Sequence, residues 1–287
     1  MISGCIRSGV AELWANKRMV LPFYLANLFF GLLVMIPFAY ALDDFVGMSM
    51  MREKLGVGMD YDFLIEFLFY GGNALTSVKG MVTLVPFAYW LAAIFLSGGA
   101  LAVFAGGARY TPSLFWSGAA AYFGRFVRLA LMILPIMIAL FCLRYLASLF
   151  QWIFFGSDPY EYVTYWGAWI KMGLGYVGLI LGGLIFDYAR IHMVLTETRK
   201  TRLSLWRGIR FAAGHPVKTL ALALLIFASG WLILLVYYGV SGLLAIPSWV
   251  VLIVLVAVQQ LYIVWRMALR LTAYSSQMVL YRRLNTQ

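Results

Sequence analysis

The segment TLALALLIFASGWLILLVYYGVSGLLAIPSWVVLIVLVAVQQLYIVW (residues 219–265) decides the fold class of this chain. It holds two apolar runs, at 219–244 and 248–265, and each is close to the roughly 20 residues with which an α-helix crosses a bilayer. Only a few residues around Ala245, Ile246 and Pro247 join the two runs. So short a connection predicts two antiparallel helices that form a membrane hairpin.

Four more apolar runs have a similar length, at residues 20–42, 81–105, 129–150 and 172–194. The chain of 287 residues is 64% hydrophobic and only 11% charged, with a mean hydropathy of +0.89. A soluble domain carries about 25% charged residues, so this composition excludes that class. We predict an all-α, polytopic membrane protein with six transmembrane helices, forming a single integral membrane domain over residues 1–287.

The charged residues predict the orientation of the spans. If both termini are cytoplasmic, the segments on that side carry a net charge of +14 and the opposite segments carry −4, and Arg144 inside a span completes the total of +11. Basic loops stay on the cytoplasmic side of a membrane, so we predict cytoplasmic N- and C-termini. Since orientation accounts for the basic residues, we predict no nucleic-acid partner.

An internal repeat is the most informative pattern in the sequence. Segments 6–21, 115–130 and 205–220 align without gaps, and each precedes a span. One alignment column holds Gly9, Gly118 and Gly208, and another matches Gly124 with Gly214.

In the third segment, Leu205 and Ile209 share one helical face while Arg207 and Arg210 share another, which is typical of a helix in the membrane interface. We therefore predict three units, at about 1–105, 109–194 and 202–287, each an amphipathic interfacial helix plus a transmembrane hairpin. Shared ancestry of the units and independent adoption of basic interfacial helices both explain the pattern, and both stay open.

Small residues in the spans predict close helix packing. Residues 173–178 also match the GxGxxG pattern of dinucleotide-binding sites, but they lie in an apolar helix and do not follow a strand, which favours packing. The predicted packing positions are Gly98, Ala102 and Gly106 in the second span and Gly178 and Gly182 in the fourth.

Asp187, Arg190 and His192 form the densest polar group at a membrane boundary. Asp187 and Arg190 are spaced i, i+3 and can pair along a helix. The group could gate a path or bind an anionic head group, and the simpler interpretation, which we favour, is an ion pair that ends the span.

Three other polar residues lie inside predicted spans. Arg144 follows Arg128 by about 24 Å of helix, which places it near the outer face, where its long side chain can reach water. Gln259 and Gln260 lie in mid-span, where hydrogen bonds between helices are a simpler role than solute binding.

Motifs of enzymes and of metal sites are not found in the sequence. There is no HxxxH, CxxC, Walker or nucleophile-elbow pattern, so we predict no metal, no cofactor and no catalytic residue. Basic residues near the cytoplasmic face predict binding of anionic phospholipids instead. They are Arg125, Arg128, Arg202, Arg207 and Arg210.

Three features of the C-terminal half are shared with known proteins: the stretch 187–190, the stretch 204–208 leading to Pro216, and Gln260 followed by Arg266 and Arg270. In these the chain loosely resembles bacterial six-span proteins similar to the membrane domain of glycerophosphodiester phosphodiesterases. The resemblance implies a bacterial inner-membrane location, an α-helical bundle and no known catalytic residue.

These observations together predict a non-catalytic membrane subunit or scaffold that binds lipid, partner proteins or further copies of itself. An alternative is a small transporter or channel with a polar path near Asp187 and Arg190. A third hypothesis is an enzyme acting on lipid head groups, which needs Asp187, His192 or Glu197 to converge in one cleft.

Overall fold

The computed structural model describes residues 2–47, 51, 60–70, 72–107, 109–156, 160–243 and 248–285. Within them every regular element is a helix, and six helices are long and apolar enough to cross a membrane. The predicted all-α class and the six spans are therefore confirmed. The predicted turn at Ala245, Ile246 and Pro247 lies outside the described residues.

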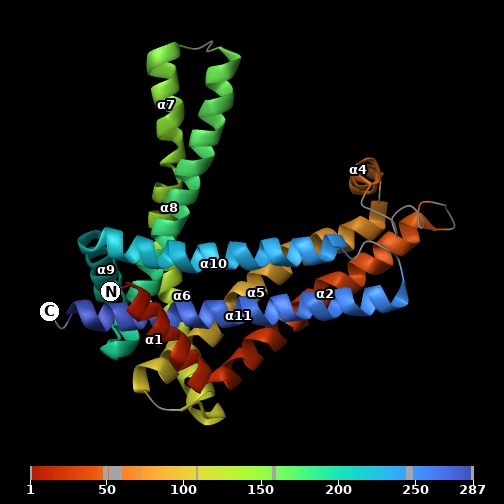
Figure 1. Ribbon diagram of the computed structural model, residues 1–287. Coiled ribbons are helices and arrows are strands. Elements are labelled where there is room, and N and C mark those ends of the chain that lie inside the picture. The colour runs from red at the N-terminus through yellow and green to blue at the C-terminus, as the bar shows by residue number, and fades with distance from the viewer. Residues whose placement is uncertain are drawn as a thin grey trace. The chain divides into compact units, whose positions relative to one another are not determined.

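The helices divide into two compact units, and α5, α10 and α11 contribute residues to both. The first unit comprises Met1–Asn16, Ser97–Ala228 and Leu271–Gln287, and the second comprises Lys17–Leu96 and Ser229–Arg270. In chain order the elements are α1 (Ile2–Ala15), η1 (Lys17–Met19), α2 (Val20–Val46), α4 (Tyr61–Tyr70), α5 (Gly72–Gly106), α6 (Pro112–Phe141), α7 (Arg144–Phe155), α8 (Glu161–Leu195), α9 (Thr201–Gly214), α10 (Pro216–Leu243) and α11 (Trp249–Asn285) (Figure 1).

Several helix boundaries differ from the sequence prediction: α6 is one helix that includes the aligned segment 115–130, and α8 begins 11 residues before the predicted start at 172. The third span is interrupted after Phe141 by a tight turn, in which the amide of Leu143 donates to the carbonyl of Leu140 at 3.2 Å. The last helix continues about 20 residues beyond the predicted end at residue 265, to Asn285. It continues because Leu271 and Met278 are buried in the first unit, so packing stabilises the helix where its membrane-length apolar run has ended.

In the first unit, α6, α7 and α9 all pack on α8. Figure 1 shows α7 and α8 running side by side as a long antiparallel pair. Glycines of α8 bring its backbone close to α6. A Cβ atom at Gly178 would lie 2.6 Å from the carbonyl carbon of Leu140, and one at Gly182 would lie 3.0 Å from Cγ of Met137. Such contacts require glycine at Gly178, because the opposing atoms belong to the backbone.

The first-column glycines of the three aligned segments make the same kind of contact. At each one, a Cβ atom would come under 3.0 Å from an atom of a neighbouring helix. The pairs are Gly9 of α1 with Ser276 of α11, Gly118 of α6 with Ala102 of α5, and Gly208 of α9 with Ala189 of α8. The three glycines therefore share a packing role, while the threefold repeat of whole units stays a prediction.

The second unit has its own aromatic core. The short helix α4 buries Phe63 and Phe67 against Ala41 and Val46 at the end of α2 and against Val78 of α5. Its other face also exposes large apolar side chains, so α4 is apolar on both faces although it is too short to span.

Candidate functional site

In the Asp187–Arg190 pair, Arg190 is buried among helices of the first unit, whereas Asp187 is partly exposed. Arg190 is only 4% exposed, its Nη2 donates to a carboxylate oxygen of Asp187, and its Nη1 donates to the hydroxyl of Ser97 on α5 at 2.8 Å. The guanidinium also lies over the rings of Phe186, at 4.3 Å, and Tyr274, at 5.2 Å. Protein groups thus surround a cation that would be costly in lipid.

A third helix completes this polar cluster. Nε2 of Gln277 on α11 donates to the second carboxylate oxygen of Asp187 at 3.1 Å, so α5, α8 and α11 are joined through one ion pair. Buried polar groups usually have partners, yet Nε of Arg190 and Oε1 of Gln277 have none among the described residues. The arrangement favours a structural ion pair that fixes helix register.

His192 belongs to a different part of the interior. Its Nδ1 lies 3.3 Å from the hydroxyl of Ser204 on α9, and its ring meets the ring of Tyr281 at 6.4 Å. His192 and Asp187 are five residues apart on α8, which separates their directions by about 140°. The two side chains therefore do not form one acid–base pair.

Arg144 and the two glutamines lie away from both groups in the chain and make local contacts. Arg144 begins α7, and its guanidinium lies over the rings of Phe141 and Tyr145, at 5.0 and 5.6 Å. In the second unit, the hydroxyl of Tyr24 on α2 donates to Oε1 of Gln260 on α11 at 2.9 Å, while Gln259 is exposed. The six polar residues predicted for a path thus fall into separate contact groups.

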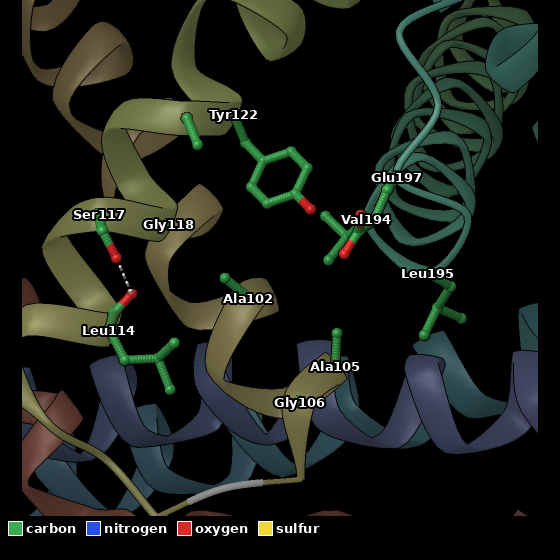
Figure 2. Close-up of a pocket in the computed structure, with 11 residues that line it drawn as sticks. Ala102, Ala105, Gly106, Leu114, Ser117, Gly118, Tyr122, Val194, Leu195 and Glu197 are labelled. Atoms are coloured by element: carbon green, nitrogen blue, oxygen red, sulfur yellow. Dashed lines mark hydrogen bonds between the residues drawn. The ribbon is translucent and has the colours of Figure 1, made fainter.

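A pocket of about 460 Å³ lies among α5, α6 and the end of α8. Figure 2 shows its lining and the hydroxyl of Tyr122 pointing toward Val194 and Glu197. Ser117 donates its hydroxyl to the carbonyl of Leu114 at 3.2 Å, which leaves Tyr122 and Glu197 as the main polar groups. The lining residues are Ala102, Ala105, Gly106, Leu114, Ser117, Gly118, Ala121, Tyr122, Val194, Leu195 and Glu197.

The sequence analysis missed this pocket. It assigned the small residues of α5 to packing, and Gly98 and Ala102 do contact α6, but at Gly106 a Cβ atom would meet nothing within 4 Å. Gly106 lines the pocket instead. Residues 102–106, 114–122 and 194–197 meet only through tertiary packing, so no local pattern marks them as a site.

Glu197 has an unusual backbone. Its φ is 50°, and it is the one non-glycine residue with a positive φ in the described part of the chain. Just before it α8 ends, where the amide of Thr196 donates to the carbonyl of His192 at 3.0 Å. A helix C-terminus carries a partial negative charge, and the carboxylate adds to it, so this end of the pocket favours a positively charged group.

The predicted lipid-binding arginines lie on α6 and α9. Arg125 is half-buried with its guanidinium 5.3 Å from the ring centre of Tyr122, and Arg128 is exposed. Helix α9 buries Ser204, Leu205, Gly208 and Phe211. Its opposite face exposes Arg202, Leu203, Trp206, Arg207 and Arg210.

Comparison of the chain with protein-family models, with curated proteins and with solved structures found no match. The resemblance to membrane domains of glycerophosphodiester phosphodiesterases therefore stays a prediction from the sequence. The functional argument consequently depends on the geometry of the chain itself.

Proposed function

We propose that the chain is a non-catalytic protein of the bacterial inner membrane, a membrane-embedded subunit or scaffold whose basic, cytoplasmic face binds anionic phospholipids. The observation that carries this proposal is the exposed face of α9, where Arg202, Arg207 and Arg210 surround Trp206, which is 63% exposed. The buried face of α9 packs on α8, so the basic face is held outward.

The physical chemistry of this face suits a lipid head-group layer. Tryptophan prefers the membrane–water interface, and arginine can extend its charge to phosphates while its stem stays apolar. Each basic residue near an anionic surface contributes about 1 kcal/mol, so three arginines would contribute about 3 kcal/mol. The other two aligned segments also expose a tryptophan, Trp14 on α1 and Trp116 on α6, which supports the same placement.

The buried contacts favour a scaffold over the alternatives. A transport path through Asp187 and Arg190 would need both groups to face water, and although Asp187 is partly exposed, Arg190 is enclosed and doubly hydrogen-bonded. A lipid enzyme would need Asp187, His192 or Glu197 in one cleft, and these three residues make different contacts. A fixed interior with a basic outer face is suited to holding lipid and partner proteins together.

The test measures lipid selectivity of the full chain. In phosphatidylcholine vesicles, spin-labelled phosphatidylglycerol should be immobilised by the protein more than spin-labelled phosphatidylcholine. The double variant Arg207→Gln/Arg210→Gln removes two charges and should lower the free-energy preference for phosphatidylglycerol by about 2 kcal/mol. The control Lys79→Gln/Lys171→Gln, on the predicted outer side, should leave it unchanged.

Two results would contradict the proposal. The lipid part fails if the wild-type chain shows no preference for phosphatidylglycerol, or if the Arg207→Gln/Arg210→Gln variant keeps it. The scaffold part fails if the chain purifies from native membranes in mild detergent as a monomer without any partner.

A further inference from the structure

We propose that the pocket containing Tyr122 and Glu197, called here the Tyr122–Glu197 pocket, binds the ammonium group of a phosphoethanolamine head group. The phosphate of the same head group would lie toward Arg125. This goes beyond the proposed function, which concerns anionic lipids on α9, and it uses different residues.

The charge of the pocket points to a cation. Within the described part of the chain, the carboxylate of Glu197 has no ion-pair partner, although it stands at the negatively polarised end of α8. The Glu197 side chain is exposed, so its carboxylate is accessible to a cation from outside the chain.

The donors and acceptors select among cations. A primary ammonium offers three N–H groups, and the Glu197 carboxylate and the Tyr122 hydroxyl are both able to accept from it. A quaternary ammonium is best held by several aromatic faces, whereas the lining contains one aromatic ring, Tyr122, which Arg125 already contacts. The pocket therefore suits ethanolamine better than choline.

The surroundings of the pocket suit the rest of the ligand. A guanidinium is a preferred partner for phosphate, and the Arg125 guanidinium lies against the same tyrosine ring that lines the pocket. The remaining walls are apolar, with Leu114, Val194 and Leu195 among them, and a volume of about 460 Å³ falls in the range of small-ligand sites. An amine, a phosphate and an apolar remainder together describe an ethanolamine phospholipid.

The experiment compares three probes by calorimetry on the full chain in detergent micelles: dihexanoyl-phosphatidylethanolamine, dihexanoyl-phosphatidylcholine and O-phosphoethanolamine. The ethanolamine lipid should bind more tightly than the choline lipid. Glu197→Gln should weaken ethanolamine-lipid binding by about fivefold, as expected for loss of one solvent-accessible ion pair. Glu161→Gln, an exposed carboxylate at the other end of α8, is the matched control and should have no effect.

A second variant tests the same pocket in case Glu197→Gln fails to fold. Ala105→Phe fills the pocket without changing the charge of its lining, and it should also weaken binding of the ethanolamine lipid. Equal affinity of the wild-type chain for the two lipids would overturn the proposal, as would unchanged binding by both variants. If O-phosphoethanolamine binds as tightly as the lipid, the proposal holds and the ligand is the soluble head group; if only the lipid binds, the ligand comes from the bilayer.

Discussion

The contact between α5 and α6 gives a sharp test of how these helices pack. Gly118 and Gly124 lie on the same helix, six residues apart, and both belong to aligned glycine columns. A Cβ atom at Gly118 would lie 2.5 Å from Cβ of Ala102, whereas one at Gly124 would meet nothing within 4 Å. The substitutions Gly118→Ala and Gly124→Ala should therefore have opposite effects on stability.

The magnitudes follow from these distances. Carbon atoms pack at about 3.5–4.0 Å, so alanine at Gly118 forces α5 and α6 apart by about 1 Å. Overpacking of this kind costs about 1–3 kcal/mol. Both variants share a gain of about 0.5–1 kcal/mol from the better helix propensity of alanine, so Gly124→Ala should stabilise the protein and the difference between the variants should equal the steric cost.

The assay is reversible unfolding of the full chain from mild-detergent micelles by dodecyl sulfate, followed by circular dichroism. Ala102→Gly removes the opposing methyl group, so the double variant Gly118→Ala/Ala102→Gly should recover most of the free energy of unfolding lost in Gly118→Ala. The reasoning is refuted if Gly118→Ala unfolds at the same denaturant fraction as Gly124→Ala. A double variant no more stable than Gly118→Ala would show that the clash lies elsewhere.

Three further predictions use the same unfolding assay. Arg190→Met leaves the partly exposed Asp187 carboxylate without its cation and should lower the free energy of unfolding by about 1–3 kcal/mol, less than for a fully buried pair, whereas Asp187→Leu/Arg190→Met should cost less; equal losses would argue against a coupled pair. Tyr24→Phe removes the hydrogen bond to Gln260 and should cost about 0.6 kcal/mol, and a Gln260→Leu background should abolish that cost. Phe67→Ala should cost about 3–5 kcal/mol, and a loss below 1 kcal/mol would show that α4 is not packed on α2.

The spans could be predicted because apolar length is a local property of the sequence. The helix boundaries could not be placed as well, since they depend on partners distant in the chain. Residues 266–285 contain several basic side chains, and burial of residues such as Leu271 and Met278 in the first unit stabilises the helix there. The tight turn after Phe141 likewise lies where α8 approaches α6, a contact that no local pattern encodes.

In the candidate site, too, local contacts could be predicted from the sequence and contacts between distant helices could not. The spacing of Asp187 and Arg190 predicted that they could pair, because i, i+3 neighbours meet on any helix. Ser97 and Gln277 could not be added from the sequence, because they come from helices about 90 residues away on either side. Glu197 was among the candidate residues, but its left-handed backbone could not be predicted, since such a turn is usually marked by glycine or asparagine.

The glycine contacts follow a cyclic order along the chain. Each predicted unit ends in a second spanning helix, called here its returning helix. The aligned segments pack on these helices in order: α6 packs on α5 of the first predicted unit, α9 on α8 of the second, and α1 on α11 of the last. The three small partner residues, Ala102, Ala189 and Ser276, are equally spaced in the sequence. Duplication of one helix-plus-hairpin unit would produce this regularity, so the contacts support the predicted repeat.

The cyclic order has an energetic consequence. Lipid tails are as apolar as the helices, so close glycine contacts and buried polar groups, more than hydrophobicity, specify which helices meet. Because the contact of α1 is made with α11, the first unit needs both ends of the chain. Removing any one predicted unit would leave one aligned segment without its returning helix and one returning helix without its segment. We therefore expect the first unit to form only when all three are present.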